Sequence, residues 1–143
     1  MEDQVVRALL DQSPDAVILA GTDGLVSFWN AAAERVFGFS AEKAIGESLD
    51  LIIPEQFREA HWKGFDHALG EGDTKYRGQA LATRAVRADG ETIYVELSFA
   101  IVKDGEGTVL GALATARDIT ERFNREREMR RKLRELEQQK AAG

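Results

Sequence analysis

Residues 93–101 read Ile-Tyr-Val-Glu-Leu-Ser-Phe-Ala-Ile, and their apolar and polar side chains alternate almost without exception. Alternation with a period of two predicts a β-strand with one buried and one partly solvated face. Turn-forming residues flank the run, at Ala88-Asp89-Gly90 before it and Asp104-Gly105-Glu106-Gly107 after it. A further apolar stretch, Val109 to Ala116, follows the second turn. The sequence therefore predicts a three-stranded antiparallel meander with residues 93–101 in its middle strand.

A second group of elements precedes this meander. The β-prone runs Ala16–Ala20 and Leu25–Trp29 enclose the turn Gly21-Thr22-Asp23-Gly24 and predict a hairpin. Asn30 and Ser40 are good N-cap residues for two short helices. A longer helix is expected from Pro54. Strands and helices in this order predict an α+β domain with a five-stranded antiparallel sheet, flanking short helices and one longer helix.

The last part of the chain differs in charge and pattern. Residues 119–143 carry eight Lys and Arg against five Asp and Glu, a net +3, which leaves −9 for the rest of a chain whose total is −6. No Gly or Pro interrupts residues 119–142, so a helix is expected to about Lys140. This helix could be a solvated single helix with many intrahelical ion pairs, or it could pair with a second helix in a coiled coil. The 3-4 spacing of four apolar residues favours a coiled-coil seam between two helices, formed by Ile119, Met129, Leu133 and Leu136.

Composition excludes several classes of protein. A net charge of −6 argues against a nucleic-acid binder, and no apolar run approaches the roughly 20 residues that a membrane helix needs. The chain has no Cys, hence no disulfide framework and no thiolate chemistry, which fits a cytoplasmic protein. We therefore expect one domain at residues 13–118, a helical cap at 1–12 and a signalling helix at 119–143.

Several motifs, taken in order, resemble the PAS sensor family from about Val5 to Phe123. These are Ser13-Pro14-Asp15-Ala16-Val17 at the first strand, Asn30 to Ser40 (NAAAERVFGFS), Ala44-Ile45-Gly46, Arg87-Ala88-Asp89-Gly90, and Arg117 to Arg122 (RDITER). The resemblance implies a sheet that cradles a cavity beneath helices, and a homodimer formed through flanking helices. It also implies output through the terminal helix to an output domain or a histidine kinase or regulator partner. Asp118, Ile119 and Thr120 then form the junction that couples sheet to helix, besides capping the helix.

The resemblance also suggests what the cavity holds. Residues 53–61, IPEQFREAH, are similar to a segment of haem-binding oxygen sensors in this family, which implies His61 as an axial haem ligand and His67 near a propionate. An inward-facing His61 with Gly64 one turn on would leave room for a flat macrocycle. The sequence departs from those sensors at two positions, with Leu81 in place of a distal Arg and Gln79 in place of the Met of a redox-type relative.

Other occupants stay open. Cysteinyl-flavin photochemistry is excluded because the chain lacks Cys, whereas a non-covalent flavin could have Trp29 or Trp62 as a ring neighbour. Phe65 lies on the same helical face as His61 and is a further pocket candidate. An unidentified small molecule or lipid, or no ligand at all, are the alternatives to haem. His61 could also be a buried His bonded to backbone or water.

No catalytic constellation stands out. The two histidines share one predicted helix, and Asp66, five residues after His61, lies about 140° away from it round that helix. The sequence also lacks a phosphate-binding Gly-rich loop and a nucleophile elbow. We expect no enzyme activity. The expected function is a signal-transduction module that senses a small ligand or cofactor state, with a ligand-free dimerisation module as the alternative and a haem-based gas or redox sensor as the lesser one.

Overall fold

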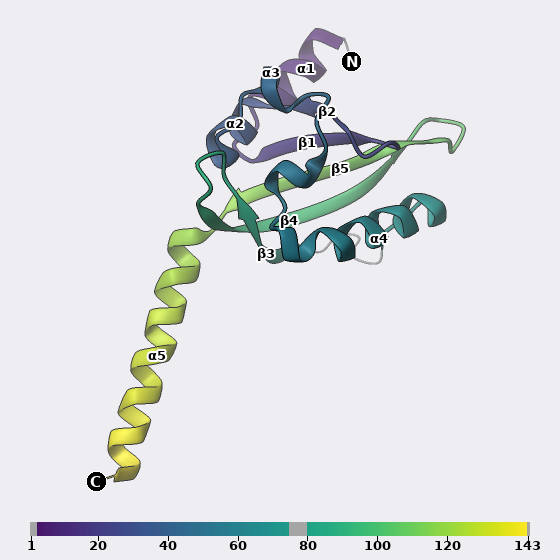
Figure 1. The fold of residues 1–143 in the computed structure, drawn as a ribbon. Helices are drawn as coiled ribbons and strands as arrows, with labels where there is room; N and C mark the ends of the chain where they lie inside the picture. The colour runs from purple at the N-terminus through teal and green to yellow at the C-terminus, as the bar shows by residue number, and fades with distance from the viewer. Residues whose placement is uncertain (1–2, 75–79, 143) are drawn as a thin grey trace.

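The computed structural model describes residues 3–74 and 80–142, which form one antiparallel sheet with helices on both of its faces and a long C-terminal helix (Figure 1). The five strands have the order β2-β1-β5-β4-β3, so the hairpin and the three-stranded meander predicted from the sequence join through β1 and β5. The α+β class and the five-stranded sheet are confirmed. The strands are β1 (Ala16–Gly21), β2 (Val26–Trp29), β3 (Ala80–Val86), β4 (Thr92–Lys103) and β5 (Val109–Asp118). The helices are α1 (Asp3–Asp11), α2 (Ala31–Phe37), α3 (Ala41–Ala44), η1 (Leu49–Ile52), α4 (Glu55–Glu71) and α5 (Thr120–Ala142).

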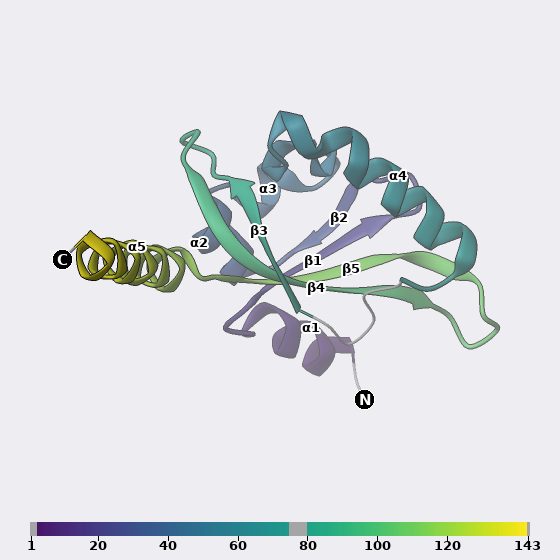
Figure 2. The same cartoon turned by 90° about the horizontal axis from the view of Figure 1, so that it is seen from below.

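The two faces of the sheet carry different helices. Figure 2 shows α3 and α4 on one face, called here the inner face, and α1 on the opposite, outer face. Figure 1 shows α5 extending away from the sheet. None of the described residues of α1 or α5 is buried, so both helices present side chains to their surroundings.

Strand β4 has the predicted alternation. Ile93 and Val95 are buried on the inner face, whereas Tyr94 and Glu96, which alternate with them, are only partly buried. On the inner face Val95 belongs to one core cluster with Ile18 and Phe37. The fully buried ring of Phe37 makes this end of the sheet, under α2, the centre of the core.

The small residues of β5 serve close packing. Gly111 has φ +156°, and a Cβ added there would lie 2.2 Å from the carbonyl oxygen of Ala20 on β1. Ala116 is buried in the core cluster. At Gly111 the absence of a side chain therefore allows β5 to approach β1 closely.

Asn30 holds three elements together. Its side-chain oxygen accepts hydrogen bonds from the backbone N–H groups of Ala33 and Val17, each at 2.9 Å. Its side-chain amide donates to the carbonyl oxygens of Leu10, at 2.8 Å, and Asp15, at 3.1 Å. The predicted cap of α2 is therefore also a fully buried link from α2 to β1 and to the end of α1.

Candidate functional site

A cavity of about 190 Å³ lies between the inner face of β3 and β4 and the segment formed by η1 and the first turns of α4. Its walls are mostly apolar, with a few polar side chains. They are Phe37, Ile52, Ile53, Phe57, His61, Leu81, Thr83, Arg84, Ala85, Val95, Leu97 and Phe99. Of the pocket residues expected from the sequence, the structure brings His61 and Leu81 together here. Leu97 and Phe99 were not singled out, although the alternation along β4 places them on the same face as buried Val95.

His61 is the most unusual group in this cavity. Its Nδ1 atom is buried and has no hydrogen-bond partner among the residues that the structure describes. Burial lowers the pKa of the imidazole, and the nearby carboxylate of Asp50 opposes that shift more weakly. His61 is therefore held in its neutral form at a cavity wall, with an unpaired nitrogen.

The lowered pKa of His61 makes stability dependent on pH. The unfolded chain takes up this proton more readily than the folded one, so folding is favoured above the ordinary His pKa of about 6.5 and weakened as the pH falls below it. Between pH 7 and 5.5, we expect this one site to reduce the free energy of unfolding by at most about 1.4 kcal/mol per pH unit. Urea denaturation at each pH measures this loss. His61→Leu should flatten the profile, and an equally steep profile in that variant would contradict the assignment.

The other expected pocket residues of α4 lie beside the cavity. The Trp62 and Phe65 rings pack with His61, with centroids 4.6 Å and 6.2 Å from the imidazole, but neither ring belongs to the cavity wall. His67 is exposed. Gly64, expected to leave room for a macrocycle, is exposed with no atom within 4 Å of an added Cβ. Gln79 lies outside the described residues.

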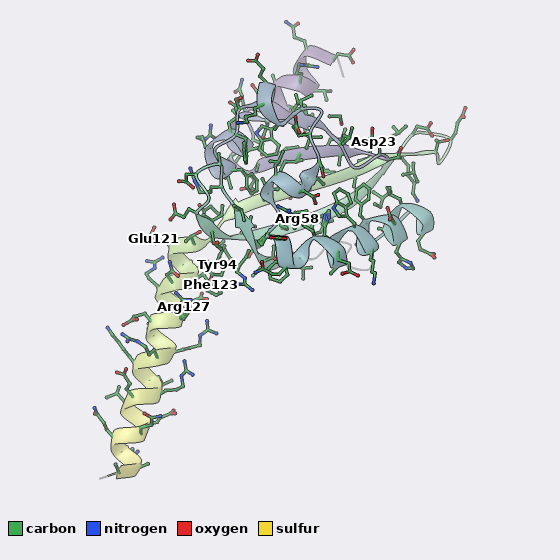
Figure 3. The ribbon with its side chains drawn as sticks, viewed as in Figure 1. Asp23, Arg58, Tyr94, Glu121, Phe123 and Arg127 are labelled. Atoms are coloured by element: carbon green, nitrogen blue, oxygen red, sulfur yellow. The ribbon has the colours of Figure 1, made fainter. Side chains whose placement is uncertain are left out.

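Trp62 fastens α4 to the rest of the domain. Its indole N–H donates to the Asp50 carboxylate at 2.7 Å, and its ring covers the β1–β2 turn so closely that a Cβ at Gly24 would lie 2.8 Å from it. Arg58, one turn earlier and labelled in Figure 3, donates to the carbonyl oxygens of Ile53 and Asp50 at 3.1 Å and 3.3 Å. These contacts close the cavity by holding α4 against η1 and the turn.

The cavity does not fit a haem as it stands. Its volume of 190 Å³ is below the roughly 300 Å³ at which pockets for drug-sized ligands begin, and a haem is larger than most such ligands. Phe57, Leu81 and Phe99 fill the space on the walls around His61. A haem would therefore need more room than these walls leave.

A second site of interest is the junction between β5 and α5. The Asp118 carboxylate accepts a hydrogen bond from the Thr120 N–H at 2.9 Å and so caps α5. The Ile119 N–H donates to the carbonyl oxygen of Tyr94 at 2.8 Å, and the Tyr94 N–H donates to the Thr120 hydroxyl at 3.0 Å. The three residues expected to couple sheet and helix thus bond α5 to strand β4 as well as to β5.

Side chains reinforce this junction on the outer face. The rings of Tyr94 and Phe123 stack with centroids 3.8 Å apart, and Arg127 lies over Phe123, as the labelled side chains in Figure 3 show. Arg122 pairs with Glu96 at 3.1 Å. The sequence pattern placed Tyr94 and Glu96 on one face of β4, but it gave no sign that α5 would cover them.

Ile119 differs from its predicted place in the seam. It is only 6% exposed, because the residue belongs to the junction and not to the free part of α5. Met129, Leu133 and Leu136 are 71%, 57% and 62% exposed. The candidate seam therefore begins beyond the junction, and Ile119 anchors it to the domain.

Two further kinds of site are absent from residues 3–74 and 80–142. No helix there is long and apolar enough to cross a membrane. Within the same residues, no group of three or more His, Cys, Asp or Glu side chains could hold a metal ion.

Comparison with solved structures supports the fold. The PAS domain of a protein from Colwellia psychrerythraea superimposes with a TM-score of 0.71 at 23% identity, over 82% of this chain and 97% of that one. This level of identity is informative about the fold alone.

Two curated relatives are sensors by name. The sensor protein FixL of Bradyrhizobium diazoefficiens is 30% identical over 100 residues, which are 70% of this chain and 20% of that protein. The oxygen sensor protein DosP of Escherichia coli is 29% identical over 116 residues, 81% of this chain and 14% of that protein. The chain thus spans a fifth or less of the length of these relatives. The family model for the PAS fold matches residues 4–119, most of the chain. On the strength of that match, together with the sheet order and the cavity, this chain belongs to the PAS family.

Proposed function

We propose that this chain is the input module of a signalling protein, in which the state of the cavity between α4 and the sheet is passed through β4 to α5. PAS domains are sensory modules, and the named relatives are sensor proteins of which this chain matches one part. The catalytic or regulatory output would lie in another domain or in a partner such as a histidine kinase.

One observation carries this proposal: alternate residues of β4 face the cavity and the output helix. Val95, Leu97 and Phe99 line the cavity on the inner face. Tyr94 and Glu96, which alternate with them, contact Phe123 and Arg122 of α5 on the outer face. A change in the position of β4 therefore alters both the cavity wall on the inner face and the contacts with α5 on the outer face.

The backbone bonds define how such a change would travel. When a ligand presses on Leu97 or Phe99, β4 shifts or twists, and the hydrogen bonds between Tyr94 and residues 119 and 120 must move with it. Because these bonds hold the first turn of α5, the helix would tilt or rotate as a unit. Two packed helices can then exchange between discrete arrangements.

A cavity-filling variant tests this coupling without knowledge of the ligand. In Leu97→Phe, the larger side chain should press on the strand, and we expect backbone amide shifts in NMR spectra at Tyr94, Ile119 and Thr120. Thr120→Val in the same background should reduce the shifts at α5 by about half or more, because the Tyr94–Thr120 hydrogen bond is lost.

Thr115→Val serves as the matched control, since it makes the same chemical change at a β5 residue outside the cavity wall and the α5 contacts. It should leave the response of α5 intact. Shifts confined to the cavity walls in Leu97→Phe would contradict transmission through β4.

We further propose that the module acts as a homodimer. The exposed Met129, Leu133 and Leu136 support a seam along α5. The exposed apolar side chains of α1, such as Val5 and Leu9 at 48% and 60%, support a second contact beside the sheet. In such a dimer the two paired α5 helices would carry the signals of both copies to the output as one unit.

A ligand-free dimerisation module is the alternative, and the small volume of the cavity favours it. In that case Leu97→Phe should leave the amide shifts of α5 unchanged while the chain still dimerises. The amide-shift comparison therefore separates the two functions.

Haem binding makes a separate prediction. Because a cavity of 190 Å³ requires α4 to move before a haem enters, we expect titration of the purified protein with haem to give no saturable one-to-one change in the haem absorbance spectrum. A saturable spectrum that disappears in His61→Ala and persists in His67→Ala would contradict this expectation and assign His61 as the axial ligand.

A further inference from the structure

Arg84 lies at the cavity and has no acidic partner among residues 3–74 and 80–142. It comes from the edge strand β3, is exposed, and places its guanidinium 4.8 Å from the centre of the Phe57 ring on α4 while also lining the cavity. No carboxylate among the described residues forms an ion pair with it. By contrast, Arg117 pairs with Asp15 and Arg122 pairs with Glu96. In a chain with 25 acidic and 19 basic residues, such a free guanidinium at a cavity is a ready anion site.

The remaining walls limit what the anion is attached to. Leu81, Leu97 and Phe99 offer apolar contact but no hydrogen bonds from their side chains. A dry cavity of about 150 Å³ holds a benzene molecule, and this one is only slightly larger, at 190 Å³. The space therefore suits an apolar body of one ring or a short branched chain.

His61 contributes to the cavity wall, but its Nδ1 atom is buried within that wall and is out of reach of a molecule in the cavity. The charge that specifies the ligand is therefore that of Arg84, beside walls that are otherwise mostly apolar.

We propose that the ligand is a small apolar carboxylic acid in its ionised form. Its ring or branched chain packs among Leu81, Leu97 and Phe99, and its carboxylate lies at the mouth of the cavity on the Arg84 guanidinium. This inference rests on the proposed function, because it names the ligand class of the same cavity.

The carboxylate would also strengthen the contact between sheet and helix. Arg84 already lies over Phe57 of α4, and a cation that is also paired with an anion is held more firmly in place. Binding would thus draw β3 and the start of α4 together. The ligand then acts on the strand pair β3–β4, which shares seven residue pairings from Ala80–Ser98 to Val86–Thr92.

Benzoate is a suitable probe, and benzyl alcohol is its neutral counterpart of similar size. Backbone amide shifts of Leu81 and Leu97 in NMR titrations measure the affinity for each. We expect benzoate to bind the wild-type chain about tenfold more tightly than it binds Arg84→Gln, the loss expected for a charge-assisted hydrogen bond. Benzyl alcohol should bind both proteins equally. Arg125→Gln, the same charge change on exposed α5, should alter benzoate affinity less than twofold.

The outcomes separate this inference from the proposed function. Equal benzoate affinity in wild type and Arg84→Gln, or benzyl alcohol binding as tightly as benzoate, overturns the carboxylate assignment. Absence of saturable shifts with either probe overturns the ligand class. In each of these cases the Leu97→Phe response at α5 still decides whether the cavity signals at all.

Discussion

Asn30→Ala is expected to lower the free energy of unfolding by about 3–5 kcal/mol, a large part of the stability of a domain of this size. The loss has two sources. Removing the cap of α2 costs about 1 kcal/mol. The buried N–H of Val17 loses its partner in Asn30, and an unsatisfied buried group costs about 1–3 kcal/mol. The part-buried carbonyl oxygens of Leu10 and Asp15 also lose the hydrogen bonds donated by the Asn30 amide. Urea denaturation followed by circular dichroism measures the change.

Two matched variants separate the sources. Asn30→Ser keeps a neutral oxygen that can cap α2 but loses the amide that donates to Leu10, so its loss should be intermediate and should loosen α1 first. Ser40→Ala removes the exposed cap of α3 alone and should cost about 1 kcal/mol. A loss in Asn30→Ala no greater than that in Ser40→Ala would show that the buried network adds nothing.

The fold was predictable because its sequence signals are local. The alternation in residues 93–101, the Gly-rich turn at 21–24 and the caps at Asn30 and Ser40 each specify one element, and each is present in the structure. Asn30 illustrates the limit of such signals. Its role as a helix cap follows from residue type, whereas its bonds to Val17 and Leu10 depend on tertiary packing and leave no mark in the neighbouring sequence.

The site was harder to predict for the same reason. Helical periodicity assigned His61, Phe65 and Gly64 to one inward face, but α4 has no buried residue, and of the residues of α4 only Phe57 and His61 line the cavity. The position of α4 is set by Trp62, through Asp50 and Gly24, which lie 12 and 38 residues away in the chain. Arg84 was not predicted either, because the sequence of an edge strand does not indicate that a cavity lies beside one of its exposed Arg residues.

The dimer prediction has the largest expected effect on assembly. Leu133→Asp combined with Leu136→Asp should convert a dimer of this chain into a monomer. Each leucine that is exposed in the single chain would be buried in a paired seam at a gain of about 1.5–3 kcal/mol, and four such side chains per dimer are replaced by charges. The dissociation constant should rise at least about a thousandfold, as measured by light scattering over a range of protein concentrations.

The control for this experiment must add the same charge to the same helix. Gln138→Asp with Gln139→Asp does so at exposed positions just beyond Leu136, the last residue of the candidate seam, and the protein should remain a dimer. Ile119 sharpens the test further, because its burial ties the start of α5 to Tyr94, so the monomer should keep the native amide shifts of the junction. A dimer that persists after both leucine substitutions would contradict the α5 seam. In that case Leu9→Asp on α1 should abolish dimerisation, because α1 carries the other exposed apolar helix face among the described residues. The signal would then reach an α5 helix that is not paired with a second α5.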